Sequence, residues 1–175
     1  LDNSVKALRI DGVEASIGNV KNGNYPYSHR LTAVTPENPE DGAEDFLRFL
    51  RSSEGQKIVE EHGYISQSNT GAFQGKKPTG TLKISCADSA EKLMEKLAEG
   101  YGRVNDQLKI EITRKNADAA LKDAAEKNSL SVLTRPLREK EKSVRDTRLA
   151  ETVFAEDGIA VVVNPVNTAE DLSVE

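Results

Sequence analysis

The sequence predicts an α/β fold around a parallel β-sheet, and three observations support this prediction. From Thr81 onward, short runs that alternate polar and apolar residues take turns with longer runs of helical period. This is the element order of a parallel sheet with right-handed crossovers. Two amphipathic helices and one further strand come before Thr81. The length of 175 residues suffices for one full α/β domain but not for two ordinary ones, so we expect one core.

The first part of the chain contains one strand and two helices. Residues 25–35 alternate after their proline, as a strand does. The first helix carries an apolar stripe at the spacings i, i+3, i+4 and i+7: Ala43, Phe46, Leu47 and Leu50. In the second helix, Ser53 is placed to cap the start, Gln56 to return the hydrogen bond, and Gly63 to end the helix. Residues 66–79 are polar and glycine-rich without a period, so we expect a linker or a long surface loop there.

In the second part of the chain, strands and helices alternate. The strands are expected at 81–85, 108–113 and 129–134, and the helices at 88–104 and 117–127. A charged segment from about Glu139 to Arg148 is expected to form a further helix. The run DGIAVVVNPVN, residues 157–167, is the most apolar in the chain, and we expect it to form a buried strand that opens at Gly158.

Composition and charge exclude several classes of protein. The 24 Lys and Arg residues against 29 Asp and Glu residues give a net charge of -5, and both signs are scattered along the chain. Nucleic acid is therefore not an expected partner, because binding it needs a concentrated basic face.

The longest apolar run, Ile159 to Val163, is far shorter than the ~20 residues that span a bilayer. No basic-then-apolar leader opens the sequence, so we expect any signal peptide to lie outside it. A single cysteine, Cys86, excludes an internal disulfide. The isolated His29 and His62 have no metal-ligand spacing, so neither a metal nor a cofactor is expected.

Three short segments follow the three strands of the alternating part. In parallel sheets, ligands bind outside the carboxyl ends of the strands, where the next helices begin. This rule directs attention to Cys86–Ala90, Arg114–Ala119 and Thr134–Pro136.

Long motifs around these segments resemble the periplasmic phosphate-binding proteins of ABC importers. The opening part of that family is matched by TLKISCADSAEKLMEKLAEGY, LKIEITRKNADAAL, NSLSVLTRPLREKE and ETVFAEDGIAVVVNPVNTAEDLS. Its closing part is matched by VKALRIDGVEASIGNVKNGNYPYSHRLTAVT and FLRFLRSSEGQKIVEEHGYIS. The resemblance implies a single lobe of a type II periplasmic binding protein. Such a lobe is an α/β three-layer sandwich around a mostly parallel sheet with one antiparallel strand.

The two matches stand in the reverse of the family's order. Residues 1–65 resemble the closing segment, residues 66–79 form the linker, and residues 80–175 resemble the opening segment. The middle part of the family, which forms a second lobe, is absent. We therefore expect residues 1–175 to form one lobe in permuted order, either as an excised junction between tandem modules or as a diverged permuted domain. The partners implied are a second lobe or second module of the same protein, an ABC permease, and a homodimer formed through exposed strand edges.

The resemblance also implies a site for inorganic phosphate or a related oxyanion, built from backbone N–H groups and hydroxyls at helix starts. Its residues would be Asp88, Ser89, Ala90, Ala117, Asp118, Thr134 and Arg135. Each group also has a purely structural interpretation. Asp88 and Glu91 can form a capping pair, and Asp118 can cap its own helix. Arg135, whose guanidinium can hold an oxyanion with two parallel hydrogen bonds, can instead form an ion pair on the lobe surface.

The sequence departs from the family's pattern in two of the three segments. Cys86 and Ala87 stand where the family has Gly and Ser, and residues 114–121 contain no glycine where the family has several. Glycine matters there because other residues hinder a close approach of the backbone to an anion. Since the second lobe would supply the other half of the ligand set, we expect weak or incomplete binding by this chain alone.

Two hypotheses about function follow. The first is an extracytoplasmic solute-binding lobe of an ABC importer or sensor. The second is a non-transport interaction or scaffold module that keeps the fold while its ligand loops have drifted. An enzyme is not expected, because the chain has no Ser/His/Asp set in a plausible context, no paired histidines, and no histidine near Cys86 in the sequence.

Overall fold

The computed structural model describes residues 4–174, and the contacts within it divide the chain into two compact units. The large unit is Arg30–Ala155, and the small unit comprises the chain up to His29 and from Glu156 onward. Two strands carry the chain across the boundary, β3 (Ser28–Pro36) and β9 (Thr147–Gly158). The expectation of one lobe over residues 1–175, with its division at residues 66–79, stays a prediction.

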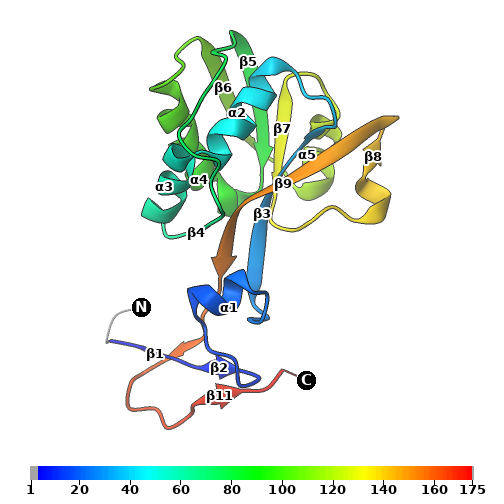
Figure 1. Ribbon diagram of the computed structural model, residues 1–175. Helices are drawn as coiled ribbons and strands as arrows, with labels where there is room; N and C mark the ends of the chain where they lie inside the picture. The colour runs from blue at the N-terminus through cyan, green and yellow to red at the C-terminus, as the bar shows by residue number, and fades with distance from the viewer. Residues whose placement is uncertain (1–3, 175) are drawn as a thin grey trace. The chain divides into compact units, whose positions relative to one another are not determined.

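A curled, mostly parallel sheet runs through the large unit (Figure 1). Its strand order is β4 (Ile65–Ser66), β9, β3, β7 (Ser129–Leu133), β5 (Gly80–Cys86) and β6 (Leu108–Arg114). Strand β5 is parallel to both β6 and β7, whereas β3 is antiparallel to β7, with Ala33 opposite Val132. The predicted α/β fold around a mostly parallel sheet with an antiparallel strand is therefore confirmed.

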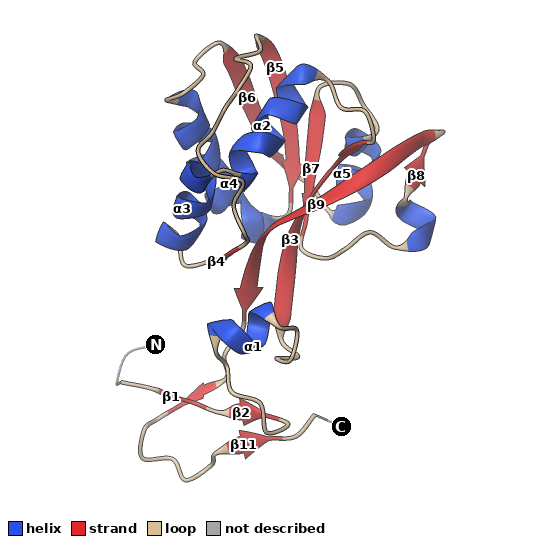
Figure 2. Cartoon of the chain, in the orientation of Figure 1, coloured by secondary structure: helices blue, strands red, loops and turns tan. Residues whose placement is uncertain are grey.

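Helices cover both faces of this sheet (Figure 2). Helices α2 (Asp41–Arg51), α3 (Ser53–Glu61) and α4 (Asp88–Gly102) pack on one face, and α5 (Ala117–Ala124) packs on the other. The strands alternate accordingly: Leu130 and Val132 of β7 belong to the first core cluster, and Leu133 belongs to the second. Both faces are buried, so the unit has the three layers that were expected.

The first core cluster is centred on aromatic rings from α2 and α4. The ring of Tyr101 lies edge-on to Phe46 and Phe49, with centroids 5.4 and 5.5 Å away. The phenol of Tyr101 donates a hydrogen bond of 2.8 Å to Asp45, a carboxylate that is only 1% exposed. Cys86, at the end of β5, is fully buried in the same cluster, and burial raises the pKa of its thiol to about 11.

The glycine-rich segment after β4 contains no helix or strand, as expected, but it is anchored along the large unit. The N–H of Lys76 donates to Asp45 at 2.7 Å, and the N–H of Phe73 donates to Glu54 at 2.8 Å. The ring of Phe73 also packs edge-on against Phe49, at 5.4 Å. The segment is thus a loop packed against the large unit rather than a free linker.

The small unit has much less regular structure. Helix α1 (Ile17–Lys21) is short, β1 (Lys6–Ala7) pairs with β10 (Val162–Val163), and β2 (Arg9–Ile10) pairs with β11 (Asp171–Leu172). Its buried apolar side chains are Leu8, Ile10, Val20 and Tyr25. Within residues 4–174, every large hydrophobic side chain that is exposed belongs to this unit: Ile17, Tyr27, Ile159, Val162, Val166, Leu172 and Val174.

Two of the predicted elements are wrong. The charged segment from Glu139 to Arg148 is not an α-helix. It forms a single 3₁₀ turn (Glu139–Glu141) and then a hairpin of β8 (Ser143–Val144) with β9. Arg145 and Asp146 join the two strands as a two-residue turn, and both have positive φ, 49° and 63°. Such a turn matches the twist of the strands it connects, which explains why a hairpin forms here.

The apolar run at residues 157–167 is the second wrong element. Strand β9 begins eleven residues before Gly158 and ends there, so only Asp157 and Gly158 of the run belong to it, and Val162–Val163 form the short strand β10. Ile159 is 49% exposed and Val162 is 42% exposed. A smaller correction concerns α3, which is capped by Ser52 rather than by Ser53; the Oγ of Ser52 accepts the N–H of Gly55 at 3.1 Å.

Candidate functional site

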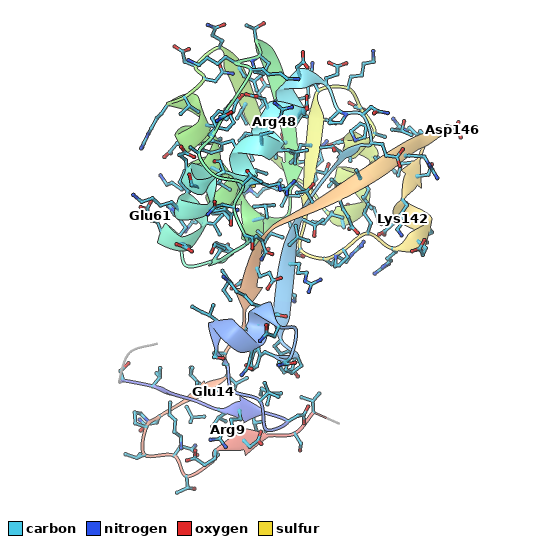
Figure 3. All side chains as sticks on the ribbon, viewed as in Figure 1. Arg9, Glu14, Arg48, Glu61, Lys142 and Asp146 are labelled. Carbon is cyan, nitrogen blue, oxygen red and sulfur yellow. The ribbon has the colours of Figure 1, made fainter. Side chains whose placement is uncertain are left out.

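The three segments singled out from the sequence meet at one edge of the sheet in the large unit. Strands β7, β5 and β6 are adjacent and parallel, so their carboxyl ends lie at the same edge. The first segment leads from β5 into α4, the second leads from β6 into α5, and the third follows β7. This is the edge at which ligands bind in parallel α/β sheets. The side chains that surround it are drawn in Figure 3.

At the first segment, the start of α4 is left without a side-chain cap. Ala87 is the N-cap residue and makes no side-chain capping hydrogen bond; the N–H of Ala90 donates instead to the carbonyl of Ala87 at 3.0 Å. The proposed capping pair of Asp88 and Glu91 is therefore wrong: both carboxylates contact Arg114, at 3.1 and 3.0 Å. Because the cap position holds an alanine, Asp88 falls in the first turn, where its charge favours the positive end of the helix. Asp88 and Ser89 are exposed, and Ala90 is buried.

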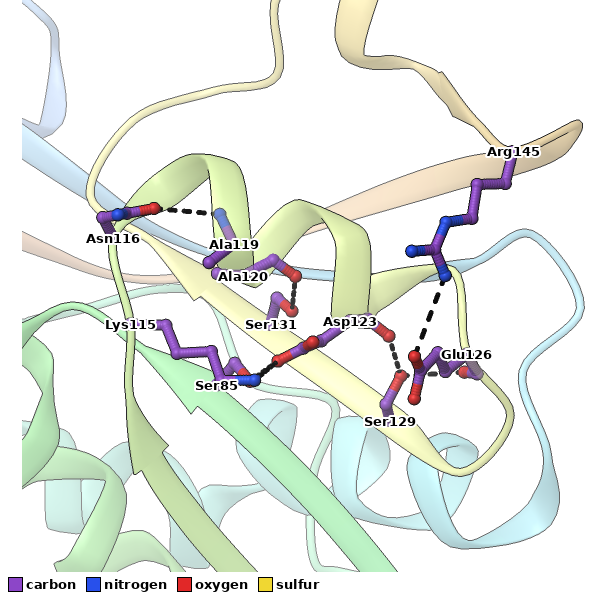
Figure 4. Close-up of polar contacts among 10 residues, drawn as sticks. All are labelled: Ser85, Lys115, Asn116, Ala119, Ala120, Asp123, Glu126, Ser129, Ser131 and Arg145. Carbon is purple, nitrogen blue, oxygen red and sulfur yellow. Dashed lines mark hydrogen bonds and ion pairs between the residues drawn. The ribbon is translucent and has the colours of Figure 1, made fainter.

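At the second segment, Asn116 caps α5. Its side-chain oxygen accepts the N–H of Ala119 at 2.9 Å, as Figure 4 shows. The proposed capping by Asp118 is therefore wrong. Ala117 is half-buried, and Asp118 is exposed in the first turn of α5.

At the third segment, Thr134 and Arg135 follow β7 and are both half-buried. The Nη1 and Nη2 atoms of Arg135 donate to the two carboxylate oxygens of Glu141, at 2.7 and 2.9 Å. Glu141 also accepts the N–H of Arg138 at 2.8 Å. Arg135 lowers the pKa of Glu141 to about 2, so this carboxylate is charged at neutral pH. The ion pair that was considered for Arg135 is present.

Two cations at this edge were not named as site residues in the sequence analysis. Arg114 ends β6 and contacts the start of α4, as described above. Lys115 follows it, and its Nζ lies 2.6 Å from Asp123, which also accepts the hydroxyl of Ser85 (Figure 4). The adjacent basic residues directly after a predicted strand were the available signal. Arg114, Lys115 and Arg135 each have a carboxylate partner within the chain, so the charge that they present to a ligand is largely neutralised.

Thr32 is a further polar group near this edge. Strand β3 is antiparallel to β7, and Thr32 lies opposite Leu133, just before the third segment. Its hydroxyl is fully buried and has no hydrogen-bond partner in the described part of the chain. Nothing in the sequence pattern distinguished it from an ordinary strand threonine.

Some kinds of site are not found in the described chain. Among residues 4–174, no group of three or more His, Cys, Asp or Glu side chains is arranged to hold a metal ion. Over the same residues, no helix has the length and apolar character needed to cross a bilayer. What the edge provides is two helix starts, a serine hydroxyl and the guanidinium of Arg135, which are groups that bind anions by hydrogen bonding.

Comparisons with known proteins identify the family. A model described as the PBP superfamily domain matches residues 71–175. Phosphate-binding protein PstS 2 of Streptococcus agalactiae serotype V is 35% identical over 176 residues, which cover 100% of this chain and 59% of the relative. The protein of the same name from Streptococcus pneumoniae serotype 4 is also 35% identical, over 99% of this chain and 59% of the relative. The chain thus spans about three fifths of the length of these relatives.

A solved structure agrees with the sequence matches. The crystal structure of a phosphate-binding protein of a phosphate ABC transporter from S. pneumoniae TIGR4 superposes with a TM-score of 0.90 at 35% identity. The superposed part covers 99% of this chain and 66% of the solved chain. The resemblance to the periplasmic phosphate-binding proteins is thereby confirmed, and this chain belongs to the PBP superfamily.

Proposed function

We propose that this chain is an extracytoplasmic solute-binding part of an ABC importer and that its ligand is inorganic phosphate or a related oxyanion. The single observation that carries the proposal is the gathering of the three segments at the carboxyl edge of the sheet, with an uncapped helix start and Arg135 among them. The names of the relatives support phosphate as the ligand and an ABC permease as the partner. The role is binding rather than catalysis, because these groups hold an anion without providing a nucleophile or a general base.

The proposed site residues are Asp88, Ser89, Ala90, Ala117, Asp118, Thr134 and Arg135. The N–H groups of Asp88 and Ser89 at the start of α4 and the hydroxyl of Ser89 would bind the anion at one segment, and Arg135 at another; the N–H of Ala90 already donates to the carbonyl of Ala87. At the start of α5, the N–H of Ala119 is already bound to the side chain of Asn116. The guanidinium of Arg135 is already paired with Glu141. Binding by this chain alone is therefore weak, at roughly 1 kcal/mol net for each hydrogen bond to a half-solvated anion.

A second lobe or second module is the proposed partner that completes the site. The relatives are longer than this chain, and the exposed apolar side chains of the small unit are those that a further part of the protein would bury. In this proposal, residues 1–65 and 80–175 are the closing and opening segments of one lobe, joined by residues 66–79. A homodimer formed through the short edge strands of the small unit would also bury these exposed apolar side chains.

A scaffold or interaction module without a ligand is the second candidate function. The observation in its favour is that Arg114, Lys115 and Arg135 are all paired internally while the second segment lacks glycine. A module of this kind would keep the sheet and its helices but would gain nothing from phosphate.

A thermal-shift series separates the two candidates, because a ligand that binds only the folded chain must raise the unfolding midpoint. The series compares phosphate, sulfate, molybdate and tungstate with chloride at matched ionic strength. A rise that is larger for one oxyanion than for chloride supports the binding role, and Ser89→Ala should reduce it. Equal midpoints in all five salts would leave the scaffold role as the conclusion.

A further inference from the structure

Arg135 retains an unused hydrogen-bonding edge even though it is paired with Glu141. A guanidinium has five N–H donors. The hydrogen bonds of Arg135 use three of them: Nη1 donates to Glu141 at 2.7 Å and to the carbonyl of Pro136 at 2.9 Å, and Nη2 donates to Glu141 at 2.9 Å. Among residues 4–174, no partner accepts from Nε or from the second hydrogen of Nη2.

The two remaining hydrogens point the same way in the plane of the guanidinium. The Nε–H and the outer Nη2–H form the side edge of the group, which can hold two oxygens of one anion in parallel hydrogen bonds. The side chain of Arg135 as a whole is 29% exposed, so solvent reaches part of it. Asp118 is among the charges that raise the pKa of Arg135, so the start of α5 lies within electrostatic reach of it.

Glu141 is held too firmly to be displaced by a ligand. Its side chain is 10% exposed, and it accepts three hydrogen bonds, two from Arg135 and one from the N–H of Arg138. The backbone carbonyl of Arg138 in turn accepts the N–H of Glu141 at 2.8 Å, which closes the 3₁₀ turn. An anion that replaced Glu141 would leave a nearly buried carboxylate with one donor, which is strongly unfavourable.

We propose that Glu141 is a positioning residue for oxyanion binding: it occupies the end edge of the Arg135 guanidinium and presents the side edge, Nε–H with Nη2–H, to the anion. This inference rests on the proposed function and adds to it the geometry of the third segment. The bound carboxylate removes the rotational freedom of a long side chain before the ligand arrives, so less entropy is lost on binding. The Arg135–Glu141 pair is close to neutral, so recognition depends on hydrogen-bond direction more than on net charge.

The test is side-chain NMR of ¹⁵N-labelled full chain, titrated with inorganic phosphate. The Arg135 signals are assigned by their loss in Arg135→Lys. Without phosphate, the Arg135 Nη signals should be resolved in the wild type and averaged by rotation in Glu141→Gln. With phosphate, the Nε–H signal of Arg135 should move. The dissociation constant for phosphate obtained from that shift should be at least about fivefold larger in Glu141→Gln than in the wild type.

Glu139→Gln is the matched control. It removes the same charge from the same 3₁₀ turn, but Glu139 is 88% exposed and, within residues 4–174, its ion pair is with Lys142. Its dissociation constant should stay within about twofold of the wild type, because exposed pairs contribute little. Backbone spectra and unfolding midpoints of both variants establish that each is folded.

The outcomes separate this inference from the proposed function. If phosphate shifts the Ser89 and Ala117 amides but leaves the Arg135 Nε–H unmoved, the function stands and the role of Glu141 is overturned. If Glu141→Gln binds phosphate more tightly, Glu141 is a competitor and the inference is likewise overturned. If phosphate moves no signal in any variant, the proposed function fails as well, and resolved Nη signals then show only a structural ion pair.

Discussion

The large and small units differ in how completely each buries its apolar side chains. In the large unit, aromatic and aliphatic residues from three helices and five strands form a continuous core on one face of the sheet, with Phe46, Leu93 and Phe154 fully buried. In the small unit, the paired strands β1, β2, β10 and β11 are two residues long, and large side chains such as Val166 remain 87% exposed. Stability should therefore be concentrated in the large unit, because two-stranded pairings are marginal by themselves.

The largest expected effect is that of removing an aromatic ring from the large unit. Phe46→Ala should lower the free energy of unfolding by about 3–5 kcal/mol, because it leaves a cavity beside Tyr101 and Phe49. Denaturant unfolding followed by circular dichroism measures this loss. Ile17→Ala in the small unit, where the side chain is 65% exposed, should change the same quantity by less than about 0.5 kcal/mol. Equal losses in the two variants would refute the difference between the units.

Gly→Ala substitutions should have opposite signs in the two units. A Cβ at Gly55 in α3 would lie 2.1 Å from the backbone oxygen of Phe49, so Gly55→Ala should destabilise the protein by about 1–3 kcal/mol. Nothing lies within 4 Å of a Cβ at Gly18 in α1, so Gly18→Ala should stabilise its helix by about 0.5–1 kcal/mol. Hydrogen exchange of the α1 and α3 amides measures both effects. A stabilising Gly55→Ala would show that the corner between α2 and α3 is looser than described.

The smallest expected difference between the units is in how their free energy of unfolding depends on pH. The folded pKa of Glu141 is about 2, below its ordinary 4.5, so its contribution is fully present above 4.5 and is lost as the pH falls toward 2. Glu141→Gln should therefore flatten the fall of unfolding free energy across that window. In the small unit, Lys6 lowers the pKa of Glu170, but this pair is exposed and salt should screen it. Unfolding curves at several pH values and two salt concentrations check both expectations. An unchanged slope in Glu141→Gln would contradict the first.

The core of the large unit was predictable because its residues follow a period. Leu82 and Ile84 alternate along β5, and Leu93, Leu97 and Tyr101 recur at helical spacing along α4, so both elements and their buried faces followed from the sequence. The hairpin at Arg145 and Asp146 could not be predicted in this way. Charged residues carry no apolar period. Arg rarely adopts positive φ, and Asp adopts it more often than most residues but far less readily than glycine, so the pair gives only a weak turn signal.

The candidate site was predictable in position but not in its contacts. The segments after β5, β6 and β7 had to meet once the strands were parallel neighbours. The capping alternatives were wrong because a shift of one or two residues decides which side chain reaches a helix start: Ala87 rather than Asp88, and Asn116 rather than Asp118. The partner of Arg135, Glu141, lies on a turn that was expected to be a helix, so no pattern connected the two residues.

The partly exposed apolar run Ile159–Val163 shows the same distinction between the units. A continuous apolar run predicts burial only if other elements are available to cover it, and the small unit supplies few. Its exposure here is a property of the surroundings and not of the residues.

The thiol of Cys86 can serve as a natural probe of opening motions in the large unit. It is the only cysteine of the chain, it is fully buried at the end of β5, and few thiolates form because its pKa is about 11. A maleimide or disulfide reagent can therefore react only when the sheet and α4 separate. The labelling rate then measures how often the core opens in the native protein, without denaturant and without any engineered probe.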